Sequence, residues 1–233
     1  MEIYKLTDNI SERPSVRTKA EVAENIQGKF LITGLKQGVR NENRVNIYVN
    51  GKYSFSLDIA QVVDLKVKIG RELTEAEFGE LKRASEYGKL YQRALEWVLT
   101  RPRSEKETRE YLRRKIRTWS SEDISEFSAR IIQQLRGKGY IDDRKFAEYY
   151  VKNRFVKKGV SEKRLKMELV KKGVAKEIIE EVLSGSERSD AEEIKKIIAK
   201  KRAKYDDDKL VAYLCQQGFS YDLVREMMEG EEG

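Results

Sequence analysis

The sequence predicts a mainly α-helical protein, in which tandem three-helix repeats form an elongated, curved array behind a small N-terminal region with a β-hairpin or sheet. The first observation is an internal repeat with a constant offset of 45 residues: Leu165, Leu169, Gly173, Ile178 and Val182 recur as Leu210, Leu214, Gly218, Leu223 and Met227. An earlier copy matches at an offset of 57, with Ser104, Thr108 and Leu112 at the places of Ser161, Leu165 and Leu169. Repeats of this length are stacked helical units, each too small to bury its apolar face alone. The second observation is the composition, with 38% charged residues and 2 prolines, which is typical of long exposed helices.

These patterns divide the chain into five segments. A mobile N-terminal arm is expected over residues 1–27, followed by a small α+β region over 28–88. The three-helix repeats follow as the first repeat (89–140), the second repeat (141–184) and the third repeat (185–233), which ends in a disordered tail.

Strand patterns follow the arm. One candidate strand spans residues 29–33, a second spans 44–49, and a third includes the alternating apolar positions of 53–57. The dipeptide Asn50-Gly51 between the last two is a strong hairpin signal.

The register of this hairpin poses a conflict. A strict two-residue loop would pair Val49 with Lys52 and put the two apolar sets on opposite faces. A three-residue connection would pair Val49 with Tyr53 and Ile47 with Phe55, on one face. Because the buried face sets the register, we expect the longer loop or a bulge. A tight turn would require both faces of the sheet to be covered.

Helix start signals locate the remaining elements. A short helix is expected over 59–66, and Thr74 with Glu77 forms a capping box for a helix to about residue 87. A further helix over about 89–100 leads into the first repeat. Ser104 and Glu107 form a second capping box.

The second repeat has its own caps. Asp142 or Asp143 is expected to cap its first helix, and Ser161 its second. In the third repeat, Asp206, Asp207 and Asp208 admit two interpretations. They lack the spacing of a calcium loop, so we favour a capping role at a helix N-terminus over a metal site.

The charge distribution points to a polyanionic partner. The net charge is +8, and residues 94–183 carry 23 basic and 15 acidic side chains, whereas residues 184–233 carry 9 and 12. The excess therefore lies on the first two repeats. A localised basic surface is typical of a protein that contacts nucleic acid, although solvated helix surfaces are also rich in lysine.

Enzymatic chemistry is not expected. The chain has no histidine, which excludes histidine-dependent catalytic triads and metal sites, and its one cysteine, Cys215, excludes an intramolecular disulfide. No phosphate-binding loop of the GxxxxGK type occurs. We therefore expect no catalytic residues, no metal and no cofactor. No apolar run is long enough to span a bilayer, and no signal-peptide pattern is present, so we expect a cytoplasmic protein.

One arginine lies within an apolar stripe. On the helix expected after Asp143, Arg154 follows Tyr150 by four residues, among inward-facing positions. An unpaired buried guanidinium is costly, so we favour a structural ion pair that ties two repeats together, through Asp142 or Asp143, over direct contact with a partner.

Exposed basic residues on the first two repeats form the predicted contact surface. In the second helix of the second repeat, basic residues cluster opposite the inward-facing leucines. The first repeat shows the same pattern, with Arg114 at the place of Lys171, whereas the third repeat has Gln216 there. Such side chains neutralise phosphates without reading bases. The predicted partner- or DNA-binding residues are Arg101, Arg103, Arg109, Arg113, Arg114, Lys145, Lys152, Lys157, Lys158, Lys163, Arg164, Lys171 and Lys172.

Four segments carry a family resemblance. They are KGYIDDRKFAEYYVKNR (138–154), RPRSEKETREYLRRK (101–115), LKMELVKKGVAKEIIEEVL (165–183) and LCQQGFSYDLVREMM (214–228). In this order they resemble RecX regulatory proteins over about residues 94–228, and residues 32–70 look like the N-terminal extension of some members. One departure is Lys115-Ile116, where the family usually has a Lys-Gly turn.

The resemblance implies a function. RecX proteins bind filaments of the RecA recombinase, lie in the filament groove beside DNA, and suppress ATP hydrolysis and strand exchange. A non-enzymatic regulator of RecA–DNA filaments in DNA repair and recombination is therefore the leading hypothesis, acting as a monomer and away from membranes. The alternative is a general DNA- or RNA-binding helical-repeat module without a recombinase partner.

Overall fold

The computed structural model describes residues 30–39, 41–116, 121–157 and 159–229, without the side chains of 121–124 and 155–157. The chain divides into two compact units, unit 1 (residues 1–89) and unit 2 (residues 90–233). Within the described residues there are ten helices and one four-stranded antiparallel sheet, so the prediction of a mainly helical protein with a small N-terminal sheet is confirmed. The predicted arm (1–27) lies outside the described residues, as does the predicted tail (229–233) apart from Glu229, which is the last residue of α10.

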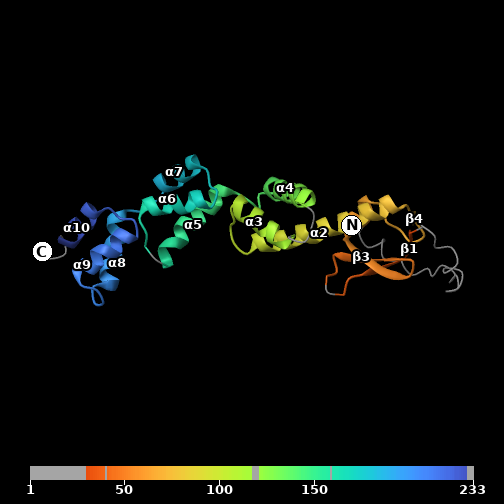
Figure 1. Cartoon of the computed structure of the whole chain (residues 1–233), viewed down its shortest axis with the longest axis horizontal. Helices are drawn as coiled ribbons and strands as arrows, with labels where there is room; N and C mark the ends of the chain where they lie inside the picture. The colour runs from red at the N-terminus through yellow and green to blue at the C-terminus, as the bar shows by residue number, and fades with distance from the viewer. Residues whose placement is uncertain (1–29, 40, 117–120, 158, 230–233) are drawn as a thin grey trace, which may run out of the picture. The chain divides into compact units, whose positions relative to one another are not determined.

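Unit 1 is a sheet packed against two helices (Figure 1). Its elements, in chain order, are β1 (Phe30–Gln37), β2 (Arg44–Val49), β3 (Lys52–Asp58), α1 (Ile59–Asp64), β4 (Glu72–Leu73) and α2 (Glu75–Leu99). The strand order is β3-β2-β1-β4, and each neighbouring pair is antiparallel. The core is made by Ile32, Ile47, Phe55 and Leu57 from the sheet and by Leu81 from α2. One face of the sheet is thereby covered by helices.

The β2–β3 hairpin combines the two alternatives that the sequence left open. The turn is tight, with Val49 opposite Lys52, and both Asn50 (φ 50°) and Gly51 (φ 78°) are left-handed, so the expected pairing of Val49 with Tyr53 is wrong. The expected bulge is present, because the register shifts between Ile47 and Tyr48. Ile47 therefore lies opposite Phe55, as predicted, and both are buried.

Helix α2 is continuous where the sequence predicts two helices. The predicted break lies near Gly88, yet α2 runs from Glu75 to Leu99, and its residues from Leu90 onward belong to unit 2. A Cβ at Gly88 would lie 2.7 Å from Oε1 of Gln61, whose amide donates to the Ala84 carbonyl. Gly88 thus serves close packing against α1 instead of ending a helix.

The capping box that starts α2 is confirmed. The Thr74 amide donates to the Glu77 carboxylate at 2.8 Å, and the Glu77 amide donates to the Thr74 hydroxyl at 3.2 Å. The Arg71 guanidinium, 3.0 Å from the same carboxylate, adds an ion pair. The pKa of Glu77 is lowered, first by the Thr74 backbone hydrogen bond and then by Arg71.

Unit 2 contains the three-helix repeats, and Figure 1 shows their helices in groups. After α2 the helices are α3 (Glu105–Lys115), α4 (Ser121–Gly137), α5 (Asp143–Lys157), α6 (Glu162–Lys171), α7 (Lys176–Ser184), α8 (Asp190–Lys201), α9 (Asp207–Gln216) and α10 (Tyr221–Glu229). The second repeat consists of α5, α6 and α7, and the third of α8, α9 and α10. The end of α2 with α3 and α4 makes the first.

The second and third repeats each bury an apolar cluster of their own. In the second repeat, Phe146, Leu165 and Leu169 are fully buried, and in the third Leu210 and Leu214 take the matching places. We refer to α3, α6 and α9 as the middle helices. Within the part of the chain that the structure describes, no helix is both long and apolar enough to cross a membrane.

Candidate partner-binding face

The repeats of unit 2 are joined end to end through their middle helices. Ser104 caps α3 by accepting from the Glu107 amide at 3.1 Å, and its hydroxyl donates to the Lys172 carbonyl at the end of α6, at 2.8 Å. Ser161 likewise caps α6, and its amide donates to the Gln217 carbonyl at the end of α9, at 3.2 Å. We call these contacts the first joint and the second joint.

An aspartate completes each joint. Asp143, the first residue of α5, accepts from the Glu105 amide at 2.9 Å, and Asp190, the first residue of α8, accepts from the Glu162 amide at 3.0 Å. The same free backbone donor of a middle helix is therefore satisfied in both joints by the following repeat. Burial raises the pKa of the Asp143 carboxyl, although the hydrogen bond from the Glu105 amide acts to lower it.

The capping box predicted at Ser104 forms only in part. The Glu107 carboxylate pairs across the first joint with Lys172 Nζ at 2.7 Å and, within its own repeat, with Arg101 at 3.2 Å. Burial alone would raise the pKa of Glu107, but the hydrogen bonds from Lys172 and Arg101 outweigh it and leave the pKa lowered. In the second joint the matching position holds Arg164, which donates to the Gln216 carbonyl at 2.9 Å.

One side of each middle helix is turned to solvent, and corresponding positions form it in every repeat. Helical spacing places them opposite the buried pairs Thr108/Leu112, Leu165/Leu169 and Leu210/Leu214. We call this surface the middle-helix face. It consists of Lys106, Arg109, Glu110, Arg113 and Arg114 in α3, of Lys163, Lys166, Met167, Val170 and Lys171 in α6, and of Asp208, Val211, Ala212, Cys215 and Gln216 in α9.

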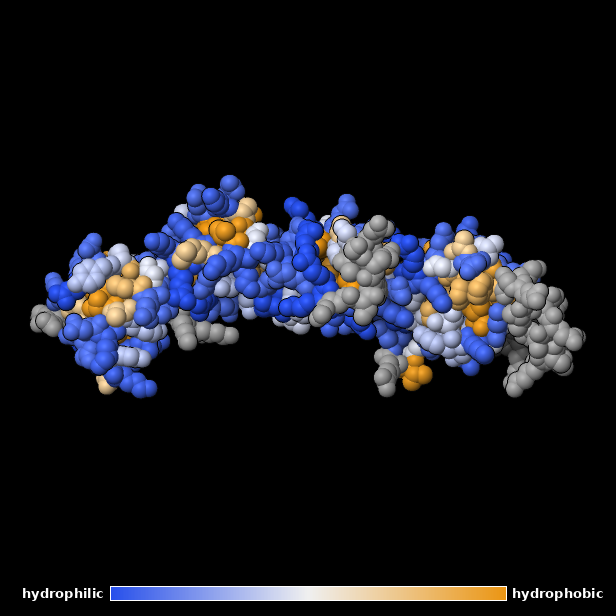
Figure 2. Space-filling view, viewed as in Figure 1, coloured by the Kyte–Doolittle hydropathy of each residue, from blue (hydrophilic) through white to orange (hydrophobic). Residues whose placement is uncertain are grey.

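The charge of the middle-helix face differs between repeats. It has four basic residues and one acidic residue in α3, three basic and none acidic in α6, and one acidic and none basic in α9. All ten positions in α3 and α6 are exposed. On the side of unit 2 seen in Figure 2, hydrophilic residues dominate and apolar residues form small separate patches. A polyanion would therefore meet this face on α3 and α6 and not on α9.

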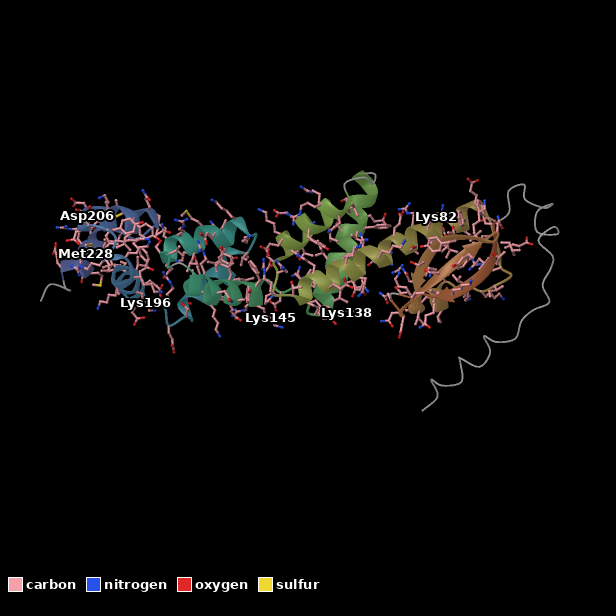
Figure 3. The ribbon with its side chains drawn as sticks, turned by 90° about the horizontal axis from the view of Figure 1, so that it is seen from below. Lys82, Lys138, Lys145, Lys196, Asp206 and Met228 are labelled. Atoms are coloured by element: carbon pink, nitrogen blue, oxygen red, sulfur yellow. The ribbon has the colours of Figure 1, made fainter. Side chains whose placement is uncertain are left out.

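Seven of the predicted contact residues are exposed, and five of them lie on the middle-helix face. Four of these five, Arg113, Arg114, Lys163 and Lys171, make no ion pair with any described residue. The fifth, Arg109, pairs with Glu105 one turn away at 2.6 Å. The other two, Lys145 and Lys152, project from α5, and Figure 3 labels Lys145 among the side chains that stand out from the ribbon.

Four other predicted contact residues serve the fold. Lys172 and Arg101 are held by Glu107, and Arg164 pairs with Glu168 and spans the second joint. Arg103 stacks on the ring of Trp97, with Cζ 4.0 Å from the centroid. These four side chains are already committed to intramolecular partners. The remaining two lie outside what is described, Lys158 entirely and Lys157 by its side chain.

Trp97 has both ring faces occupied. Arg103 lies against the ring, and Tyr111 is stacked on it at 4.4 Å between centroids with an interplanar angle of 8°. Stacking on both sides leaves no room for a nucleobase on this indole. The ring instead fixes the end of α2 to α3.

The predicted partner of Arg154 is wrong. Arg154 pairs with Glu168 of α6 at 2.9 Å, which ties two helices of one repeat together, whereas Asp142 caps α5 through the Arg144 amide and Asp143 belongs to the first joint. The hydrogen bond from Arg154 lowers the pKa of Glu168 to about 2. Burial, followed by the hydrogen bond to Glu168, raises the pKa of the Tyr150 hydroxyl to about 12.

The sequence places Met167 among the basic residues of α6, but sequence reasoning missed two features of the face, namely the apolar strip that Met167 forms with Val170 and two further lysines. Met167 and Val170 are 50% and 48% exposed on α6, so an apolar strip divides Lys163 and Lys166 from Lys171. Lys106 and Lys166 also belong to the exposed set. The spacing was the available signal: Lys106 precedes Arg109 by three residues and Lys166 follows Lys163 by three. Residues three or four apart share a helix face.

Comparisons with known proteins agree on one family. The family model described as RecX, second three-helix domain, matches residues 142–183, and that described as Regulatory protein RecX N-terminal domain matches residues 30–74. The Regulatory protein RecX of Bacillus licheniformis is 33% identical over 201 residues, covering 83% of this chain and 74% of that protein. That of Listeria monocytogenes is 32% identical over 205 residues, covering 83% and 73%.

A solved structure supports the fold. The crystal structure of a regulatory protein RecX matches with a TM-score of 0.65 at 24% identity, covering 86% of this chain and 99% of that one. Sequence and fold therefore agree, and the chain belongs to the RecX family of regulatory proteins.

Proposed function

We propose that this chain is a non-enzymatic regulator that binds RecA–DNA filaments and inhibits the ATPase and strand-exchange activities of the recombinase, thereby modulating DNA repair and recombination. The family membership supports a regulatory role, and the resemblance of the repeats to RecX proteins supplies RecA as the partner. We expect the protein to act as a monomer in the cytoplasm.

The middle-helix face is the observation that carries this proposal. Its basic residues on α3 and α6 belong to helices that meet end to end at the first joint, where the carbonyl of Lys172 accepts from Ser104. Exposed lysine and arginine side chains can neutralise successive phosphates or acidic side chains without an enclosed pocket. A filament offers such a repeating partner, because identical recombinase subunits recur at regular intervals along a continuous DNA strand.

The apolar strip of α6 favours a protein component in the contact. Met167 and Val170 are exposed between basic residues, and methionine adapts well to irregular partner surfaces. Phosphates alone would give these two side chains no favourable environment. We therefore propose that α6 contacts the recombinase while the arginines of α3 contact DNA or acidic groups beside it.

The test is ATP hydrolysis by RecA filaments preformed on single-stranded DNA, with this protein added at substoichiometric amounts. We expect the wild type to lower the rate. The double variant Arg114→Glu/Lys171→Glu should lose most of this inhibition while keeping its helical circular dichroism. Lys195→Glu/Lys200→Glu, which makes the same charge change at exposed positions of α8, is the matched control and should inhibit like the wild type.

The alternatives give different results. Full inhibition by Arg114→Glu/Lys171→Glu would show that the face is wrong. An absence of inhibition by the wild type, together with salt-dependent binding to bare DNA, would point to a general nucleic-acid-binding module instead.

A further inference from the structure

The sheet of unit 1 has a second face, opposite the helices, and a row of three residues crosses it. Gly34 on β1 pairs with Tyr48 on β2, and Tyr48 pairs with Tyr53 on β3. The neighbouring row, Leu35, Ile47 and Phe55, points to the core. Because side chains alternate along strands, the Tyr48 row lies on the outer face.

The β-bulge is what places Tyr53 there. In a regular strand Tyr53 and Phe55 would share a face, since they are two residues apart. The register shift between Ile47 and Tyr48 reverses the alternation at Ser54, so that Tyr53 is 55% exposed whereas Phe55 is 3% exposed. Bulges commonly re-aim a side chain at a binding surface.

The two tyrosines form an open aromatic pair. Their ring centroids are 6.1 Å apart with an interplanar angle of 78°, so one ring meets the other by its edge and the pair keeps a ring face without an aromatic neighbour. Tyr48 lies across Gly34, where a Cβ would be 3.5 Å from the Cβ of Tyr48. The pair is thus held against the backbone, and Tyr53 is its exposed member.

Basic side chains flank this pair. Lys36 Nζ lies 5.2 Å from the centroid of the Tyr48 ring, and Arg44 on β2 holds the Ser56 hydroxyl on β3 at 3.1 Å. Of the three basic residues in β1, β2 and β3, Lys36 and Arg44 lie on the outer face, whereas Lys52 lies opposite the buried Val49. Asp58, the one carboxylate of these strands, pairs with Arg44 across β2 and β3. The outer face therefore carries an aromatic pair and a small excess of positive charge, because Asp58 offsets Arg44 and Lys36 has no carboxylate opposite it in the sheet.

We propose that the outer face of the sheet binds single-stranded nucleic acid, with a base stacked on Tyr53 and a backbone phosphate near Lys36. Exposed aromatic rings on an antiparallel sheet bind unpaired bases by stacking, and neighbouring cations hold the phosphates. A duplex does not fit this surface, because its bases are already stacked and paired. This inference rests on the proposed function in one respect only, which is that the single strand would come from a RecA–DNA filament.

The experiment uses the full-length protein and a fluorescein-labelled oligothymidylate, without recombinase, followed by fluorescence anisotropy. We expect Tyr53→Ala to weaken binding about tenfold, within the range for loss of one stacked base. Tyr53→Phe keeps the ring and should bind like the wild type. Tyr221→Ala, at a tyrosine of α10 that is 59% exposed, is the matched control and should change nothing.

A second measurement keeps the test independent of folding and of the filament. An oligonucleotide containing 5-bromodeoxyuridine, irradiated with the wild-type protein, should crosslink to a peptide that contains Tyr53. Unchanged binding by Tyr53→Ala, the absence of oligonucleotide binding, or crosslinks confined to residues 90–233 would each overturn the proposal. None of these outcomes bears on inhibition of RecA by the middle-helix face, which the ATPase assay tests separately.

Discussion

The carboxylate of Glu168 accepts two hydrogen bonds from the guanidinium of Arg154, at 2.9 Å from Nε and 3.0 Å from Nη2. The Tyr150 hydroxyl donates to the same carboxylate at 2.8 Å, and Arg164 Nε lies 3.4 Å from it. Arg164 also donates to the Gln216 carbonyl of the third repeat. The cluster therefore connects α5 and α6 of the second repeat to the second joint.

Removing the charge of Glu168 should destabilise unit 2. We expect Glu168→Gln to lower the free energy of unfolding by about 2 kcal/mol, because the amide cannot satisfy two guanidinium groups that are partly buried. Urea unfolding followed by circular dichroism measures the change. Glu162→Gln, at the exposed Lys166 pair of the same helix, should stay within about 0.5 kcal/mol of the wild type. Equal effects of the two substitutions would contradict a structural role for the cluster.

The same carboxylate predicts a dependence on pH. The pKa of Glu168 is lowered to about 2, first by the hydrogen bond from Arg154. A folded-state pKa below the unfolded value of about 4.3 means that the ionised group contributes stability that is complete above the unfolded pKa and is lost as the pH falls toward 2. Urea unfolding at several pH values should therefore show a steeper loss in the wild type than in Glu168→Gln below about pH 5. Parallel curves would argue against the prediction.

Two left-handed glycines, one in the turn between α4 and α5 and one at the second joint, allow the cost of backbone strain to be separated from the cost of packing. Gly139 (φ 73°) and Gly218 (φ 94°) both disfavour a side chain, but a Cβ at Gly139 would meet open space whereas one at Gly218 would meet the Ser161 hydroxyl and, at 3.3 Å, the Cβ of Arg164. We expect Gly139→Ala to cost about 1 kcal/mol from strain alone. Gly218→Ala should cost about 1–3 kcal/mol more, because the second joint must shift. Thermal unfolding compares them, and similar losses would mean that the joint yields easily.

The joint aspartates should differ in importance. Asp143→Ala removes the acceptor of the Glu105 amide and should cost about 1 kcal/mol. Asp190→Ala should cost more, because Asp190 also accepts from Arg188, whose side chain is 5% exposed. Asp143→Asn keeps an oxygen acceptor and relieves a carboxyl whose pKa burial raises, so it should be nearly neutral. Urea unfolding of the three variants gives the order, and a larger loss for Asp143→Ala than for Asp190→Ala would reverse it.

Arg103 and Arg113 test the separation of structural from contacting arginines. Arg103→Ala should expose Trp97 and shift its fluorescence to longer wavelength, measured in a Trp119→Phe background, while filament inhibition changes little. Arg113→Ala should leave the fluorescence and the unfolding midpoint unchanged and weaken inhibition. The opposite pattern would move the contact surface to the end of α2.

The fold was largely predictable because its signals are local. Helix caps at Thr74, Ser104 and Ser161 depend on residues within one turn of the helix start. The repeat is visible in the sequence because the same buried apolar positions recur at a constant offset. The bulge between Ile47 and Tyr48 was predictable for the same reason, since only a shifted register places Ile47 and Phe55 on one face of the sheet.

The remaining features depend on contacts between distant residues. Glu168 is 14 residues from Arg154 and on another helix, so its role follows from the packing of α5 on α6, which the spacing of apolar residues does not specify. Glu107 satisfies the local rule for a capping box, yet its carboxylate meets Lys172, 65 residues away. From the sequence alone Gly88 predicts a helix break, and only the structure shows that the side-chain amide of Gln61 packs against it. In the candidate site, Arg114 is exposed whereas Arg103 is partly buried against Trp97. This difference can be seen only in the folded chain.

Both joints use a serine, an aspartate and a turn glycine at corresponding places of successive repeats. A repeat thus carries at each end the groups that its neighbours require. An in-frame duplication of the second repeat would bring the same serine, aspartate and glycine to the new joint, because nearest-neighbour contacts supply the stability of such arrays. Only the position of Arg164, which would meet Lys172 in place of Gln217, would have to adapt. The number of repeats is consequently a trait that gene duplication can alter in one event, and that a protein engineer can choose.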